Sequence, residues 1–249
     1  MESAHAAHPM RALASLWRLV LLGLVFLLGI WASASGTLTA MMAYREDIGF
    51  LTLQHLELVA ISGAIAIVTG IPIGIVLARR SLGLFGPLLA QIINLGTTIP
   101  TLAILALAMT VLGLGAPPAI FGLALLTLLP IVLNTVAGLR AVPPALVEAA
   151  RGMGMTSWQI LFQVELPNAL FVIAAGIRTA LAINVGTVPL AFLIGGGGLG
   201  ELIFTGIDLM DTGLLLAGAI PTALLAIGVD FIVGQLQFWL VPRGVNPLR

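Results

Sequence analysis

Residues 143–167 read PPALVEAARGMGMTSWQILFQVELP and form a polar connection between two strongly apolar stretches. Pro143 and Pro144 suit the start of a helix, because proline at the first helical position has no N–H to lose. Gly152 and Gly154 are poor helix formers, so we expect them to end this helix. The connection therefore begins with one short helix that a glycine-containing turn stops.

A second short helix is predicted in the same connection. Thr156 with Gln159 three residues later is the pattern of a capping box. Pro167 removes a backbone donor, so we expect it to bend the chain into the next apolar stretch. The product is a helix-turn-helix whose small Ala149 and Ala150 are exposed for close approach to a partner. On these grounds alone, an ordinary amphipathic loop remains the alternative.

The rest of the chain has a composition that water-facing domains do not have. Of its 249 residues 60% are hydrophobic and 8% are charged, with a mean hydropathy of +1.17, whereas a soluble domain has roughly 25% charged residues. There is no lysine and no cysteine, which excludes a phosphate-loop lysine, a Schiff base and a thiolate site. The formal net charge is zero, so no nucleic-acid-binding surface is expected.

Six apolar stretches are long enough to be membrane spans, and they cover residues 19–34, 56–78, 87–112, 119–139, 168–194 and 213–241. The third is interrupted by Asn94, Thr97, Thr98 and Pro100. The first also fits a cleavable signal peptide, with small residues at 32–34. We favour an uncleaved helix, because the stretch is long for a signal peptide and more spans follow. The predicted fold is an all-α polytopic membrane protein with six transmembrane helices.

The arginine distribution predicts the orientation, because arginine in short loops stays on the cytoplasmic side. With the N-terminus inside, the inner segments hold eight of the ten arginines: 11, 18, 79, 80, 140, 151, 243 and 249. Arg45 is outside and Arg178 lies in the fifth span. Both termini are therefore predicted to be cytoplasmic. We divide the chain into a tail with the first helix (1–34), a core (50–241) containing an inner loop (141–167), and a C-terminal tail (242–249).

The inner loop carries a spaced pattern that resembles a known family. Glu148-Ala149-Ala150, three residues, Gly154, nine residues, Val164, one residue and Leu166-Pro167 resemble the cytoplasmic "EAA" signature of ABC importer permeases. The only departure is Val164, where the signature has isoleucine. Residues 50–241 look most like the permeases of glycine betaine, carnitine and choline importers, on the segments 70–74, 99–101, 176–180, 184–187 and 194–200.

This resemblance implies a type I ABC importer permease fold in a bacterial cytoplasmic (inner) membrane. The family's permeases work as pairs, so a second permease chain, identical or different, is expected in the lipid bilayer. Two cytoplasmic ABC ATPase subunits would bind ATP and Mg, and a separate extracytoplasmic binding protein would deliver the substrate. This chain would then be no enzyme and hold no cofactor or metal. The ATPase-coupling residues implied are Glu148, Ala149, Ala150, Gly152, Gly154, Val164, Leu166 and Pro167.

Two charged residues fall in the middle of predicted spans. Arg178 lies ten residues after Asn168, and Asp230 lies eleven before Val241. Both are roughly 15 Å from the inner face at 1.5 Å per residue. Because mid-membrane charges usually find a partner, we predict an interhelical ion pair. The alternatives are bonds to backbone or water and, least favoured, direct substrate contact.

Further polar or helix-bending residues stand in the apolar stretches, and we take them as candidates for a pathway lining or gate: Asn94, Thr97, Thr98, Pro100, Asn134, Asn184 and Thr187. The alternative is that they only hold the helices together through hydrogen bonds. Glycines 195–198 and 200 are expected to form a turn where backbones pass closely, since no lysine or strand supports a phosphate loop.

The predicted substrate is a small osmoprotectant such as glycine betaine, choline or carnitine, and the first alternative is methionine or another amino acid. An ion-coupled transporter or channel would need repeats or paired membrane carboxylates, which we do not find. An intramembrane protease would need a base beside a nucleophile such as Ser62. Neither class accounts for the pattern between Glu148 and Pro167.

Overall fold

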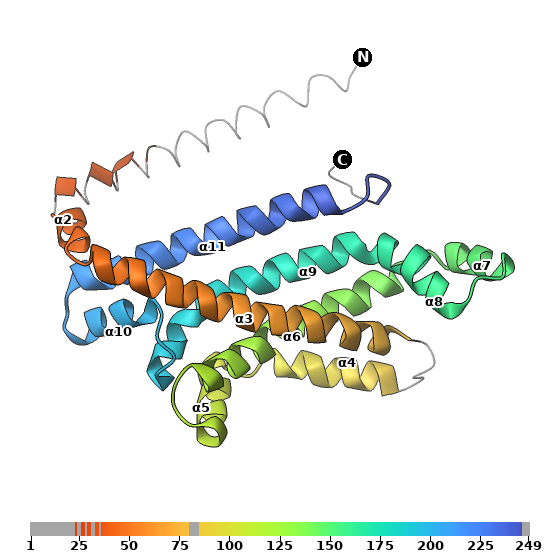
Figure 1. Cartoon of the computed structure of the whole chain (residues 1–249), viewed down its shortest axis with the longest axis horizontal. Coiled ribbons are helices and arrows are strands. Elements are labelled where there is room, and N and C mark those ends of the chain that lie inside the picture. The colour runs from red at the N-terminus through yellow and green to blue at the C-terminus, as the bar shows by residue number, and fades with distance from the viewer. Residues whose placement is uncertain are drawn as a thin grey trace, which may run out of the picture.

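The computed structural model describes residues 36–79 and 85–245, together with isolated positions between 23 and 34. Within these residues every regular element is helical (Figure 1), which confirms the all-α class. The elements are α2 (Thr37–Met42), α3 (Arg45–Ala78), α4 (Phe85–Gly96), α5 (Thr101–Leu112), α6 (Ala116–Arg140), α7 (Pro144–Gly152), α8 (Ser157–Ile160), a π-helical segment (Leu161–Glu165), α9 (Leu166–Thr187), a 3₁₀ segment (Val188–Ile194), α10 (Gly200–Asp208) and α11 (Thr212–Leu240).

Four helices of the described chain are long and apolar enough to cross a membrane: Arg45–Ala78, Ala116–Arg140, Ser157–Ile194 and Thr212–Leu240. They contain the predicted second, fourth, fifth and sixth spans. Most of the predicted first span, 19–34, lies outside the described residues, and so do both chain ends. The count of six spans and the cytoplasmic placement of the termini therefore remain predictions.

The third predicted span, 87–112, is interrupted at Thr97, Thr98 and Pro100, as the sequence indicates. The structure has two helices of 12 residues each, α4 and α5, separated at 97–100. The hydroxyls of Thr97 and Thr98 donate to the carbonyls of Asn94 and Leu95 at 2.6 and 2.7 Å. Pro100 has no N–H to continue the ladder and instead precedes the first turn of α5. Apolarity alone does not distinguish such a broken pair from one long helix.

Glycines set the closest helix crossings in the bundle. Gly70 of α3 lies on Ile131 of α6, where an added Cβ would meet the Ile131 side chain at 3.1 Å. On α9, Gly176 is in contact with the side chain of Asn134, which leaves no room for a Cβ. Small residues at membrane-helix interfaces let backbones approach closely. Since lipid is as apolar as leucine, this close packing holds α3, α6 and α9 together.

The glycine cluster forms the predicted close turn. Gly195, Gly197 and Gly198 have φ values of 78°, 77° and 83°, which favour glycine. The Gly198 N–H donates to the Gln54 side chain at 2.8 Å, so the turn is held against α3.

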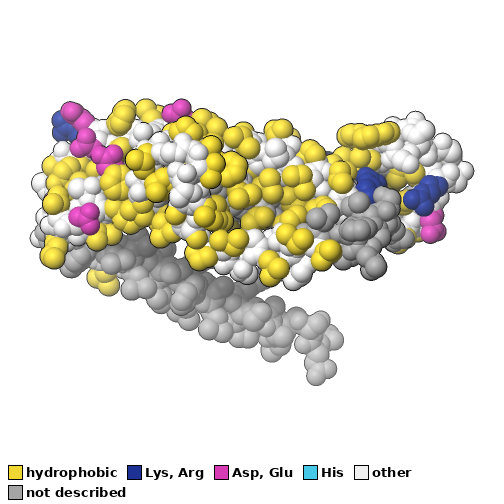
Figure 2. Space-filling view, turned by 90° about the horizontal axis from the view of Figure 1, so that it is seen from below, with side chains coloured by type: hydrophobic (Ala, Val, Ile, Leu, Met, Phe, Trp, Pro, Cys, Tyr) yellow, Lys and Arg dark blue, Asp and Glu magenta, His cyan; other side chains and the backbone are white. Residues whose placement is uncertain are grey.

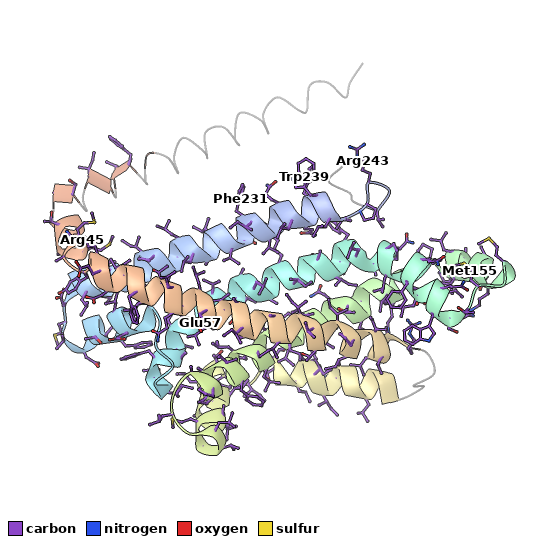
Figure 3. The ribbon with its side chains drawn as sticks, in the orientation of Figure 1. Arg45, Glu57, Met155, Phe231, Trp239 and Arg243 are labelled. Atoms are coloured by element: carbon purple, nitrogen blue, oxygen red, sulfur yellow. The ribbon has the colours of Figure 1, made fainter. Side chains whose placement is uncertain are left out.

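The two ends of the bundle carry different charges. The end that carries α7 holds the arginines at 79, 140, 151 and 243 with two acidic residues, Glu148 and Glu165, whereas the opposite end holds five acidic residues, at 46, 47, 201, 208 and 211, with Arg45. Figure 2 shows the charged side chains mainly at the two ends with a largely apolar band between them. Figure 3 places Arg243 and Met155 at one end and Arg45 at the other. A bilayer would cover this band.

Candidate functional site

The loop between α6 and α9 projects from one end of the bundle (Figure 1), and its first half is α7. Gly154, just past this helix, has φ +81°. The N–H of Gly154 donates to the Arg151 carbonyl at 2.9 Å and that of Met155 to the Ala150 carbonyl at 3.1 Å. This is a Schellman motif, which satisfies the last carbonyls of a helix and requires a left-handed residue. The predicted role of Gly154 as a helix stop therefore has a definite geometry.

The second half of the loop begins with the predicted capping box. The Thr156 hydroxyl accepts from the Gln159 N–H at 3.4 Å, and the Gln159 side chain accepts from the Thr156 N–H at 2.8 Å. The chain then stays helical past Pro167, from Ser157 through the π-helical segment into α9, so this proline does not break the helix. The Asn168 side chain donates to the Val164 carbonyl at 2.7 Å, and the wider π turn accommodates the proline.

The two alanines of the signature do not share one environment, which corrects the expectation that both are exposed. Ala149 is exposed, whereas Ala150 is only 1% exposed. Ala150 is enclosed by the chain because α7 folds back on α8 and the π-helical segment. Only Ala149 can offer a small side chain to a partner, and Ala150 instead sets how closely the two halves of the loop pack. Glu148, Gly152 and Gly154 are exposed beside Ala149.

The tip of the loop presents large apolar side chains to its surroundings. Met153, Trp158 and Phe162 are 74%, 71% and 60% exposed. The rings of Trp158 and Phe162 stack with centroids 5.8 Å apart. We call these three residues the loop tip. Large exposed apolar groups beside polar residues are typical of protein interaction sites.

The base of the loop is fixed to the bundle. Val142 and Leu161 pack in one buried apolar cluster with Leu139 and Ile173, and Ile75 of α3 borders it. An apolar cluster that spans α3, α6, α9 and both halves of the loop makes a rigid link between the loop and the membrane helices. The last three positions of the signature are half-buried at this base: Val164, Leu166 and Pro167.

An ion pair adds a second link between the loop and α3. Arg79, at the end of α3, donates from Nη1 to the Glu165 carboxylate at 2.8 Å. Arg140 donates to the Leu77 carbonyl at 3.3 Å. Glu165 is not among the residues predicted from the sequence, because it occupies the unspecified position between Val164 and Leu166. Its charge next to an apolar span was the only signal in the sequence.

The structure brings Arg178 of α9 and Asp230 of α11 together. Arg178 donates from Nε and Nη2 to the two oxygens of Asp230 at 2.7 and 2.6 Å. Such a two-point contact is the strongest geometry for a guanidinium and a carboxylate. The guanidinium lies over Gly234, where an added Cβ would be 3.0 Å from Cζ.

The other candidate pathway residues do not converge on one place. Asn94, Thr97, Thr98 and Pro100 are exposed at the break between α4 and α5. Asn134 packs between α6 and α9 and donates to the Pro130 carbonyl at 2.9 Å. Among the described residues, the hydrogen bonds that join two of these candidate pathway residues are all local bonds between neighbours in the same stretch of chain.

Asn184 and Thr187 differ in burial. Asn184 is buried and donates to the Ser62 hydroxyl at 2.8 Å, so it belongs to the packing between α3 and α9. The Thr187 hydroxyl donates to the Asn184 carbonyl at 2.9 Å.

Ser62 donates its hydroxyl hydrogen to the Leu58 carbonyl at 2.6 Å. It therefore has no base to take its proton, as a nucleophile would require.

A cavity of about 570 Å³ lies between α4, α5 and α6, and its lining is apolar throughout, including Ile99, Leu107 and Phe121. It offers no polar group to a charged solute. In the part of the chain that the structure describes, no group of three His, Asp or Glu side chains could hold a metal ion.

Long apolar helices, charged ends and an anchored polar loop define a polytopic membrane protein. The family model described as "Binding-protein-dependent transport system inner membrane component" matches residues 70–244, and the chain belongs to this family. It is therefore a permease subunit of an ABC importer in the inner membrane.

Several curated relatives cover most of the chain. It is 50% identical over 222 residues to the osmoprotectant import permease protein OsmY of Salmonella typhimurium, covering 89% of this chain and 93% of that one. Its identity to the glycine betaine/carnitine/choline transport system permease protein OpuCD of Bacillus subtilis is 45% over 210 residues, which is 83% and 89% of the two chains. The carnitine transport permease protein OpuCB of Listeria monocytogenes is 41% identical over 202 residues, or 80% and 90%.

Solved structures share the fold. The MetNI methionine ABC transporter in an inward facing conformation has a chain that matches with a TM-score of 0.69 at 24% identity, covering 77% of this chain and 94% of that one. An amino acid ABC transporter matches with a TM-score of 0.63 at 20% identity, covering 81% and 96%. These likenesses support the predicted type I permease fold.

Proposed function

We propose that this chain forms, with a second permease copy or a related chain, the membrane passage for a small quaternary-amine osmoprotectant. A separate extracytoplasmic binding protein delivers the solute, and cytoplasmic ATPase subunits power its passage. The substrate class rests on the relatives, whose names specify osmoprotectants, carnitine, glycine betaine and choline. The methionine alternative has weaker support, because the methionine transporter is only 24% identical and supports the fold alone.

The anchored loop with its exposed tip is the structural feature that most supports this function. In this proposal α7 and α8 sit in a groove of an ATPase subunit, with Ala149 allowing close approach and the loop tip supplying apolar contact. Movement of the ATPase then reaches the membrane helices through the buried cluster around Leu161 and through the Arg79–Glu165 pair. Closely packed interiors transmit such displacements because they resist compression.

Charge supports the orientation that this function needs. The end that carries α7 holds four of the described arginines, at 79, 140, 151 and 243. Arginine in short loops favours the cytoplasmic side, which is also where an ATPase could reach the loop.

Uptake measurements test the proposed function. Cells lacking their own osmoprotectant uptake would express this chain with its ATPase and binding protein, and labelled glycine betaine, choline, carnitine and methionine would be supplied in turn. We expect uptake of at least one quaternary amine, lost when the ATPase carries a substitution that blocks hydrolysis. Uptake that is independent of the ATPase, or that is limited to methionine, would contradict the proposal.

A further inference from the structure

The Arg178–Asp230 pair lies deep between two spanning helices. Arg178 is twelve residues after the start of α9 and Asp230 is ten before the end of α11. At 1.5 Å per residue they lie roughly 15–18 Å from the end that carries the loop, which is the middle of a hydrocarbon core about 30 Å thick. The side chains are nevertheless 39% and 41% exposed on this chain. Charges at this depth do not face acyl chains, so something polar covers them.

The pair leaves hydrogen-bonding capacity unused. A guanidinium has five N–H donors, and Asp230 accepts from two of the Arg178 nitrogens, Nε and Nη2. No other described residue accepts from Arg178, so both hydrogens of Nη1 are free. Each Asp230 oxygen likewise has a lone pair to spare. Gly234 permits this arrangement, because its missing side chain lets the guanidinium lie flat on α11.

Among the described residues, the surface beside the pair does not supply the missing partners. Ile227, one turn from Asp230, is 67% exposed and apolar, and so is Phe231 at 63%. Figure 3 shows Phe231 on the edge of α11 that points away from α9. A second copy docking through the same surface would bring mainly apolar groups to the free N–H donors. Water or a solute anion satisfies them instead.

We propose that the seam between α9 and α11 at Arg178 and Asp230 faces the aqueous passage and is a transient binding station for a zwitterion that carries a carboxylate and a quaternary ammonium. This rests on the proposed function and adds the residues that meet the solute. The carboxylate accepts from the free Nη1 hydrogens of Arg178. The quaternary ammonium has no N–H and is held beside Asp230 by charge alone. The ion pair between Arg178 and Asp230 stays intact while the solute is bound, so each side chain interacts with the solute only weakly. Weak binding lets a solute leave as well as enter.

The first test compares two solutes in the reconstituted transporter with its ATPase and binding protein. Glycine betaine carries both charges, whereas choline carries only the cation. We expect Arg178→Gln to lower the betaine-to-choline uptake ratio about tenfold, as the loss of a charged hydrogen bond would. Asp230→Asn should lower both rates and change the ratio little. Arg243→Gln, outside the spans, is the control and should change neither.

An unchanged ratio in Arg178→Gln with normal uptake would overturn the station. A second result would also overturn the station. In it, each single variant loses both uptake and binding-protein-stimulated ATP hydrolysis, and the charge-swapped variant Arg178→Asp with Asp230→Arg recovers both fully. That pattern defines a purely structural contact. If the unsubstituted transporter takes up neither solute, the proposed function fails, and this result is distinct from a failure of the station.

A second measurement leaves the pair intact. The chain has no cysteine, so Thr179→Cys, exposed next to Arg178, introduces the only thiol. We expect a small water-soluble thiol reagent to label it in the assembled transporter, and glycine betaine at saturating concentration to slow the labelling. Phe231→Cys, on the other edge of α11, should not react. Absence of labelling at Thr179→Cys, or labelling only at Phe231→Cys, would show that water does not reach the seam between α9 and α11, and would contradict the proposal.

Discussion

Gly152 and Gly154 stand two residues apart in the loop between α6 and α9 but have different backbone requirements. Gly154 has φ +81°, whereas Gly152 is helical, and a Cβ added at either position would meet no atom within 4 Å. Any cost of a side chain is therefore conformational and falls on Gly154. We expect Gly154→Ala to destabilise the loop by about 1 kcal/mol, and Gly152→Ala to be neutral or slightly stabilising.

Amide hydrogen exchange in α7 of the purified protein measures this difference. Faster exchange is expected only in Gly154→Ala. A bulky residue at Gly154 should further leave membrane insertion intact while ATP hydrolysis no longer drives uptake. Equal exchange in both alanine variants would contradict the assignment of the turn.

Ala149 and Ala150 allow a second comparison at the scale of the residue. Ala150 is buried within the chain, so Ala150→Leu should overpack the loop and lower its stability by roughly 1–3 kcal/mol. Ala149→Leu should leave the isolated chain as stable as before but weaken binding of the ATPase. Thermal unfolding of the permease and co-purification of the ATPase separate the two effects. If the ATPase still co-purifies with both variants, docking at this surface is contradicted.

Some of these residues could be predicted from the sequence and others could not, for a physical reason. Arg178 and Asp230 could be paired because equal depth on two spans follows from the helix rise. The burial of Ala150 could not be predicted, since it depends on how α7 folds back after the turn. Glu165 was missed because its partner Arg79 is 86 residues away in the chain.

At the scale of the element, the Arg79–Glu165 pair joins α3 to the π-helical segment that leads from the loop into α9. The pair is 34% and 17% exposed, so we expect Glu165→Gln to cost on the order of 1 kcal/mol in stability or less. The larger effect should be on the coupling of ATP hydrolysis to transport, with fewer solute molecules moved per ATP hydrolysed. The exchanged variant Arg79→Glu with Glu165→Arg should restore this ratio of solute moved to ATP hydrolysed.

The ratio of glycine betaine transported to ATP hydrolysed in proteoliposomes tests this link. Arg243→Gln, an exposed arginine outside the loop between α6 and α9, serves as the control for loss of one charge. If Glu165→Gln and this control behave alike, the ion pair does not carry motion to α3.

The N-terminus of α11 gives a pH-dependent prediction. Asp211 accepts from the Leu214 N–H at 3.0 Å and from the Tyr44 hydroxyl at 3.1 Å. The Leu214 hydrogen bond, followed by that from Tyr44, lowers the pKa of the Asp211 carboxyl. A lowered pKa in the folded state contributes stability that is present above the ordinary value near 3.9 and is lost as pH falls through the folded value.

Thermal unfolding of the detergent-solubilised protein should therefore show a constant difference between the unsubstituted chain and Asp211→Ala above about pH 5. This difference should shrink below about pH 4. A difference that grows on acidification would contradict the cap.

The bounds of a helix follow from apolarity where the apolar stretch is continuous, and the geometry of a break depends on local hydrogen bonds. The predicted spans 119–139 and 213–241 agree closely with α6 and α11. The predicted span 87–112 was expected to be interrupted, and α4 ends where the hydroxyls of Thr97 and Thr98 bond back to the chain just before Pro100. Hydropathy counts both threonines as mild interruptions and does not include their local hydrogen bonds.

At the scale of the whole molecule, the fold is an apolar bundle with a charged, anchored loop at one end. Its class and family follow from composition and from the pattern between Glu148 and Pro167. The surfaces that meet the second permease, the ATPase and the binding protein do not follow from one chain, because an exposed apolar side chain such as Leu224 or Val111 looks the same toward lipid as toward protein.

In the proposed transporter, an ATPase binds the loop between α6 and α9 from the cytoplasm. Because the chain has no cysteine, Met153→Cys on the loop tip and Met210→Cys at the opposite end each introduce a single thiol, and both positions are highly exposed. Disulfide cross-linking in intact cells to an ATPase with one cysteine in its docking groove is the most direct measurement. We predict a cross-link from Met153→Cys that changes with bound nucleotide, and none from Met210→Cys, which an impermeant thiol reagent should label from outside. Labelling of Met153→Cys from outside, with no cross-link to the ATPase, would contradict the claim.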